Sequence, residues 1–133
     1  KAALSGGAVL GAPLAHDFCV ISLSDRLTSW EVIETRLACA ARGDFALALY
    51  NPSSKGRPDY LQKAVRILLA NGKTPETVCG IVRNIGREGQ EKRVLTLAEL
   101  EKMQVDMFTT VFIGNAATRE LAGRMVTPRG YKR

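Results

Sequence analysis

The sequence predicts an α/β domain built on a mixed, largely parallel sheet flanked by helices. Short apolar runs rich in valine, isoleucine and leucine alternate along the 133-residue chain with segments whose apolar residues recur every three to four positions. This alternation of strand-like and helix-like segments is typical of α/β proteins. The length suits one domain over residues 1–133, and neither an internal repeat nor a long linker divides it.

The first predicted strand and helix occupy residues 18–42. Residues 18–23 form the strand, and Thr28 with Glu31 has the spacing of a capping box, which starts a helix. The apolar face of that helix consists of Trp30, Ile33, Leu37, Ala40 and Ala41. We expect Gly43 to end the helix in a left-handed conformation.

The second strand is predicted over residues 44–50, and a turn-rich loop at residues 52–58 leads to the next helix. The apolar stripe of this helix consists of Leu61, Ala64, Val65, Leu68 and Leu69. Asn71 and Gly72 stop it, because both residue types favour turns.

The second half of the chain begins with a strand at residues 77–82, followed by a tight polar turn and a short edge strand at residues 92–95. The spacing of a capping box recurs at Thr96 and Glu99, ahead of a short helix. Residues 110–113 read as another buried strand, and residues 124–130 close the chain as a strand or an extended tail.

The net charge of +6 and the isoelectric point of about 9.6 favour an anionic partner, either a nucleic acid or a carboxylate-rich small molecule. Aromatic residues make up only 6% of the chain and do not alternate with the basic residues, which argues against a platform that stacks bases. Because apolar runs stay short of the roughly 18 residues of a membrane helix, we expect a cytoplasmic protein without membrane contact.

The sequence favours neither a metal site nor a disulfide framework. Cys19, Cys39 and Cys79 are odd in number and far apart, so we expect buried, reduced thiols. His16 is the only histidine and has no ligand-like spacing to other residues, so its role is structural or acid/base. The chain starts at Lys1 without the features of a signal peptide, and we expect it to be the rear part of a longer protein.

Three apolar runs end in an asparagine before a polar loop, at Asn51, Asn84 and Asn115. Because ligands of parallel α/β sheets bind beyond the carboxyl ends of the strands, we expect these three ends to converge on one site. Asparagine is also common in ordinary turns, which is the alternative interpretation. The glycine-containing loops match neither the dinucleotide-binding pattern nor the P-loop pattern, which argues against a nucleoside triphosphate.

Five segments of the chain together resemble one family. They are residues 11–25, 49–52, 80–84, 86–89 and 127–131, which include the His-Asp-Phe, Tyr-Asn-Pro and Thr-Pro-Arg-Gly-Tyr motifs. In this order they resemble the C-terminal half of the precorrin-3B C(17)-methyltransferases, a family of tetrapyrrole methylases in corrin (cobalamin) biosynthesis.

The resemblance implies a two-domain, commonly homodimeric enzyme that binds S-adenosylmethionine between two α/β domains. The glycine-rich loop of the N-terminal domain is missing here, so we expect this chain alone to be inactive, and we expect residues 1–15 to form a helix or linker between the domains. The implied cofactor contacts are Tyr50, Asn51, Arg83, Asn84, Gly114, Asn115 and Ala116.

The family reaction methylates carbon 17 of the macrocycle with contraction of the ring, and it leaves S-adenosylhomocysteine as a product. For the accompanying proton transfers the candidates are His16 and Asp17. Arg83, Arg87 and Arg129 would anchor the acetate and propionate groups of the tetrapyrrole, although a solvated basic rim is the alternative. The resemblance covers both metal-free and cobalt-containing substrates.

Two other functions stay open from the sequence. One is a noncatalytic basic module that binds an anion or a protein partner. The other is a methylase of the same fold that acts on RNA or protein, for which tight, salt-sensitive RNA binding would be the signature.

Overall fold

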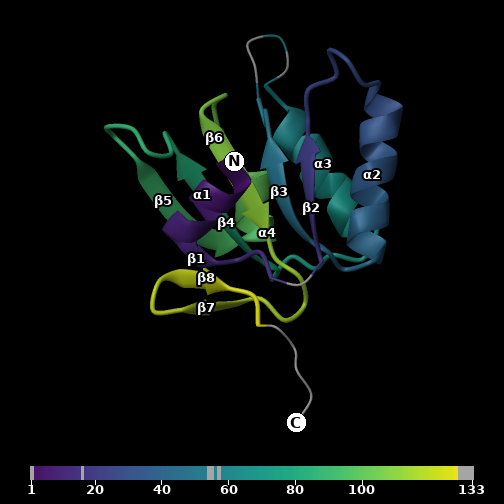
Figure 1. Ribbon diagram of the computed structural model, residues 1–133. Helices are drawn as coiled ribbons and strands as arrows, with labels where there is room; N and C mark the ends of the chain where they lie inside the picture. The colour runs from purple at the N-terminus through teal and green to yellow at the C-terminus, as the bar shows by residue number, and fades with distance from the viewer. Residues whose placement is uncertain (1, 16, 54–55, 57, 129–133) are drawn as a thin grey trace.

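The predicted α/β architecture is confirmed, with helices on both faces of a mixed five-stranded sheet (Figure 1). The computed structural model describes residues 2–15, 17–53, 56 and 58–128. In chain order the elements are α1 (Ala2–Leu10), β1 (Gly11–Ala12), β2 (Phe18–Ser22), α2 (Trp30–Arg42), β3 (Ala46–Tyr50), α3 (Tyr60–Ala70), β4 (Val78–Arg83), β5 (Glu91–Thr96), α4 (Leu97–Glu101), β6 (Thr109–Ile113), β7 (Arg119–Leu121) and β8 (Arg124–Val126).

The main sheet has the strand order β2-β3-β6-β4-β5. The prediction of a largely parallel sheet is wrong, because only β2 and β3 pair in parallel, whereas β6 is antiparallel to both β3 and β4, and β5 is antiparallel to β4. The turn between β4 and β5 reverses the direction of the chain. The connection through α4 then crosses to the other side of β4, so β6 runs in the same direction as β5. As a result β6 enters between β3 and β4 in the opposite direction.

A smaller sheet of order β1-β8-β7 lies below the main sheet in Figure 1. The strand expected near the end of the chain is present as β8, which pairs in parallel with β1. Residues 1–15 were expected to form a helix or linker, and the described part of that segment contains α1 and the short β1.

The core has two layers, one on each face of the main sheet. On one face, Leu47 and Leu49 of β3 pack with buried residues of α2, α3 and α4. On the other face, Ala48 packs with Leu10 of α1 and with Phe112 of β6. Because neighbouring residues of a strand point to opposite faces, β3 contributes to both layers and is buried from Ala46 to Leu49.

The helix boundaries agree with the sequence except at α2. Its N-cap is Ser29 rather than Thr28, and the Ser29 hydroxyl accepts a hydrogen bond from the amide of Val32. Its end also differs, because Gly43 keeps a right-handed φ of −82° while Asp44 takes the left-handed φ of 53°. The predicted apolar faces of α2 and α3 are confirmed, and the capping box that starts α4 is present in full.

Candidate functional site

Two of the three predicted strand ends lie at the same edge of the sheet, at the top of Figure 1. β3 and β4 flank β6 and are both antiparallel to it, so they run in the same direction and end on the same side. Asn51 follows β3 with a φ of 53°, and Asn84 follows β4 with a φ of 55°. Asparagine tolerates this left-handed conformation better than most residues, which explains its presence at both turns.

A hollow of about 230 Å³ lies between these two strand ends and the start of β6. It is lined by Tyr50, Asn51, Asn84, Ile85, Arg87, Met107, Phe108, Thr109 and Thr110. A larger hollow of about 630 Å³ adjoins it and shares Asn51 and Met107. We call the two together the strand-end cleft. The predicted site residues that line it are Tyr50, Asn51, Asn84 and Arg87.

Hydrogen bonds to the end of β2 support Asn51. Its side-chain amide donates to the hydroxyl of Ser22 at 2.9 Å, and the amide of Leu23 donates to the carbonyl of Tyr50 at 2.9 Å. The ends of β2 and β3 are therefore linked, and they form one wall of the strand-end cleft.

Asn84 is held by its own main chain. Its main-chain amide donates to the main-chain carbonyl of Phe108 at 3.1 Å, and its main-chain carbonyl accepts from the main-chain amide of Arg87 at 3.0 Å. The turn of residues 84–90 contains two glycines with positive φ, Gly86 and Gly89, as a tight polar turn requires. Arg87 is exposed on this turn and lines the cleft, which fits its predicted role as an anion anchor.

Arg83 has a partner that the sequence analysis did not anticipate. Its guanidinium Nε donates to Oδ2 of Asp106 at 2.6 Å, and both side chains are about 40% exposed. Burial raises the pKa of Asp106, but hydrogen bonds from Arg83, from the amide of Phe108 and from the hydroxyl of Thr109 lower it more, so the net shift is downward. Asp106 is therefore charged at neutral pH.

The third strand end, Gly114–Ala116, lies at the opposite edge of the sheet, and the prediction that all three ends converge is wrong. Because β6 is antiparallel to β3 and β4, it ends where they begin. The amide of Gly114 donates to the carbonyl of Val78 at 2.9 Å, at the start of β4. Cofactor contact by this segment stays a prediction. The segment lies at the edge of the sheet away from the strand-end cleft.

Polar groups of the Gly114–Ala116 segment bond within the protein. The carbonyl of Gly114 accepts from Nζ of Lys73 at 2.7 Å, and the amide of Ala116 donates to the carboxylate of Asp44 at 3.0 Å. A Cβ at Gly114 would lie 2.5 Å from the side chain of Thr118, so this glycine is explained by close packing against threonine rather than by the approach of a ligand.

Lys73 is the residue of this edge that the sequence analysis missed. Its side chain is only 2% exposed, and its ammonium also donates to the carbonyl of Phe45 at 2.7 Å and to Asp44 at 3.2 Å. Burial lowers the pKa of Lys73, although the Asp44 carboxylate opposes the shift. No local sequence signal marks this lysine as buried, because its partners are distant along the chain.

Of the predicted acid/base pair only Asp17 lies within the described residues, and it does not line the strand-end cleft. His16 and Arg129 lie outside those residues. Asp17 is exposed and directly precedes β2, and Ser22 ends that strand, so about 16 Å of extended chain separates Asp17 from Ser22. The catalytic role of Asp17 stays a prediction, and the residue lies at the edge of the sheet where β6 ends.

The cysteines differ from the expected buried thiols in one case. Cys79 is buried and Cys19 is partly buried, but Cys39 is exposed on α2. Burial raises the pKa of the Cys79 thiol to about 12. Within the described part of the chain, no three metal-binding side chains cluster, and no helix has the length and apolar character needed to cross a bilayer.

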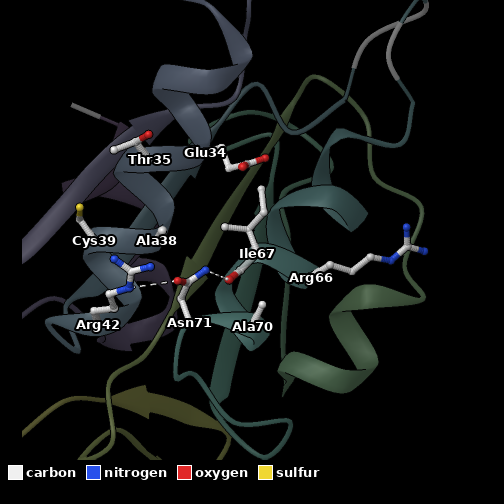
Figure 2. Close-up of a pocket in the computed structure, with 9 residues that line it drawn as sticks. All are labelled: Glu34, Thr35, Ala38, Cys39, Arg42, Arg66, Ile67, Ala70 and Asn71. Carbon is white, nitrogen blue, oxygen red and sulfur yellow. Dashed lines mark hydrogen bonds between the residues drawn. The ribbon is translucent and has the colours of Figure 1, made fainter.

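A separate hollow of about 480 Å³ lies between α2 and α3, on the outside of the helical layer (Figure 2). Its polar groups bond to one another: Nε of Arg42 donates to Oδ1 of Asn71 at 3.1 Å, and the Asn71 amide donates to the carbonyl of Ile67 at 2.8 Å. This groove contains none of the predicted site residues.

The cleft also contains two exposed apolar side chains that the sequence analysis did not select. Met107 is 63% exposed and Phe108 is 50% exposed, in the turn before β6. Two adjacent large apolar residues in a polar turn were the available signal, since a contiguous exposed apolar patch can mark a ligand-binding groove.

Comparisons with known proteins identify related sequences over most of the chain. A family model described as Tetrapyrrole (Corrin/Porphyrin) Methylases matches residues 2–101. A probable cobalt-factor III C(17)-methyltransferase of Salmonella typhimurium is 45% identical over 130 residues, covering 98% of this chain and 54% of that protein. A precorrin-3B C(17)-methyltransferase of Sinorhizobium sp is 45% identical over 136 residues, covering 98% and 53%.

The crystal structure of the methyltransferase CobJ is similar in fold as well as in sequence. It superposes with a TM-score of 0.86 at 42% identity, covering 96% of this chain and 53% of the CobJ chain. The chain thus spans about half the length of the curated relatives it matches.

Proposed function

Because this chain belongs to the family of tetrapyrrole (corrin/porphyrin) methylases, we propose that it is the C-terminal half of an S-adenosylmethionine-dependent C(17)-methyltransferase of cobalamin biosynthesis. Its substrate is precorrin-3B or the cobalt-containing counterpart, and the reaction contracts the macrocycle. An N-terminal domain completes the site, and the complete enzyme is a homodimer.

One observation carries the proposed location of the cofactor. Asn51 and Asn84, two of the residues implied by the resemblance, line the same strand-end cleft although they are far apart in the chain. The other implied segment, Gly114–Ala116, lies at the opposite edge, so the proposal uses Tyr50, Asn51 and Asn84 and leaves that segment out.

The lining of the cleft fits an adenosyl group. Met107 and Phe108 offer an apolar wall against which an adenine ring can pack, and the asparagine turns offer main-chain and amide groups for its polar atoms. When bound, the cofactor supplies a methyl group carried on a positively charged sulfur. The residues of this chain then act by holding the two reactants in line, which is the largest contribution that such a transfer needs.

Arg87 is the proposed anchor for the carboxylates of the tetrapyrrole. It is exposed on the 84–90 turn at the rim of the cleft, where a planar guanidinium can pair with a carboxylate through two hydrogen bonds. Arg83 is a weaker candidate, because Asp106 already takes its Nε. The proposal does not extend to Asp17, which lies toward the other edge, whereas His16 remains a candidate for proton transfer.

The test uses the complete protein, in which this chain is joined to its N-terminal domain. Calorimetry should show binding of S-adenosylhomocysteine, and Phe108→Ala should weaken it about tenfold, because a half-exposed phenylalanine that becomes buried on binding contributes roughly 1–2 kcal/mol. Leu121→Ala is the matched control, since Leu121 is 56% exposed on β7, away from the cleft. Equal losses in both variants would contradict this site.

Turnover tests the substrate. The complete protein should add one methyl group to precorrin-3B or cobalt-factor III by mass spectrometry, while this chain alone should not. Arg87→Ala should raise the KM for the tetrapyrrole and leave the affinity for S-adenosylhomocysteine nearly intact, with Arg66→Ala, on the outer face of α3, as the control. Tight, salt-sensitive RNA binding without tetrapyrrole turnover would favour the RNA methylase, and anion binding without cofactor binding would favour the noncatalytic module.

A further inference from the structure

We infer that Asp106 is a positioning residue of the strand-end cleft, because its carboxylate holds the turn that carries Met107 and Phe108 against the end of β4. This inference rests on the proposed function, since it assigns the cleft to the adenosyl cofactor. Asp106 itself need not touch the ligand.

Both oxygens of the carboxylate are used, and they bond to two different elements. Oδ2 accepts from Nε of Arg83, the last residue of β4, at 2.6 Å. Oδ1 accepts from the amide of Phe108 at 3.0 Å and from the hydroxyl of Thr109 at 3.1 Å. One side chain therefore joins β4 to the turn of residues 106–109.

The main chain of the same turn completes the connection. The carbonyl of Phe108 accepts from the amide of Asn84 at 3.1 Å, and Thr109 pairs with Arg83 in the sheet. Asn84 and Phe108 both line the cleft, so the shape of this part of the lining depends on how the turn is held against β4. The side-chain carboxylate of Asp106 adds hydrogen bonds that hold the turn in this position.

The turn holds its two apolar side chains in an exposed position. Met107 and Phe108 are 63% and 50% exposed, and such side chains pack tightly against a ligand only if the backbone beneath them is ordered. A turn that is already fixed in the free protein loses less conformational freedom on binding, which raises the affinity. Removing the Asp106 contacts should therefore weaken binding even though no ligand contact is removed.

The contribution of Asp106 to folding is expected to be small. The ion pair with Arg83 is partly exposed on both sides, at 41% and 40%, and pairs of this kind stabilise folded proteins little. A loss of ligand affinity can thus be separated from a loss of stability, which distinguishes a positioning role from a structural one.

The experiment measures S-adenosylhomocysteine affinity by calorimetry, and thermal stability, in the complete protein. Asp106→Ala should weaken binding about tenfold with little change in melting temperature. Asp106→Asn should lose less, because its amide oxygen can still accept from Phe108 and Thr109. Asp59→Ala is the matched control, since Asp59 is exposed and forms an exposed ion pair with Lys63.

Amide hydrogen exchange supplies a second readout that does not depend on ligand. In Asp106→Ala the amides of Asn84 and Phe108 should exchange faster than in the wild type, whereas Asp59→Ala should leave them unchanged. Wild-type affinity in Asp106→Ala would overturn the positioning role alone. Failure of the wild type to bind S-adenosylhomocysteine would overturn the proposed function and, with it, this inference.

Discussion

Replacing Lys73 by methionine should destabilise the fold more than any exposed lysine substitution. The ammonium of Lys73 donates to two main-chain carbonyls at 2.7 Å, those of Phe45 and Gly114, and to the carboxylate of Asp44 at 3.2 Å. Methionine has a similar length and fits the same space, but it carries no donor. The substitution therefore removes hydrogen bonds without creating a large cavity.

The magnitude follows from the burial of these groups. Each buried carbonyl that is left without a donor costs about 1–3 kcal/mol. Asp44 is 49% exposed and can be solvated again, and burying methionine avoids the desolvation of a charge, which offsets part of the loss. We expect a net decrease of roughly 2–4 kcal/mol in the free energy of unfolding, which lowers the melting temperature by about 8–15 °C in a domain of this size.

The assay is urea and thermal unfolding of this chain followed by circular dichroism. Lys63→Met is the matched control, because Lys63 forms an exposed pair with Asp59 and should change the free energy of unfolding by less than about 0.5 kcal/mol. If Lys73→Met changed stability as little as the control, the buried hydrogen bonds of Lys73 would not be stabilising and the reasoning would be refuted.

Three further predictions concern other parts of the molecule. Gly114→Ala should lower the free energy of unfolding by about 1–3 kcal/mol, because the added Cβ would lie 2.5 Å from the side chain of Thr118. The affinity for S-adenosylhomocysteine in calorimetry should stay unchanged, and a specific loss of affinity would return this segment to the cofactor site. Iodoacetamide should label Cys39 in the native protein and spare Cys79, as read by peptide mass spectrometry, because Cys79 is buried with a pKa raised to about 12; equal labelling would contradict this. Since the native state lowers the pKa of Asp106, its carboxyl group binds a proton more weakly there than in the unfolded chain, so its small stabilisation is present above about pH 4 and is lost as the pH falls through the native pKa. The small difference in the free energy of unfolding between wild type and Asp106→Asn should therefore narrow from about pH 6 to about pH 3, and a constant difference would argue against the shift.

The candidate site could be predicted in part. Asn51, Asn84 and Arg87 were selected from the sequence, and the structure places them around one cleft. Asn115 was selected by the same rule and lies at the opposite edge. The rule assumes parallel strands, so it holds for β3 and β4, which run in the same direction, and fails for β6.

The sequence by itself determined the local elements and the family. The apolar periodicity of α3 and the capping box of Thr96 and Glu99 depend on residues a few positions apart, and both are present as predicted. Each segment that resembles the tetrapyrrole methylases is likewise contiguous in the chain, and the family match over residues 2–101 includes four of the five. Such features are visible in sequence because the interactions that cause them are short in range.

Only the tertiary structure decided the strand directions and the partners of the charged side chains. Lys73 bonds to carbonyls 28 and 41 residues away, and Asp106 bonds to Arg83 at a distance of 23 residues. Neither residue differs locally from a solvated charge in a loop. These contacts join segments that are far apart in the chain, and hydrophobic periodicity contains no information about which segments will meet.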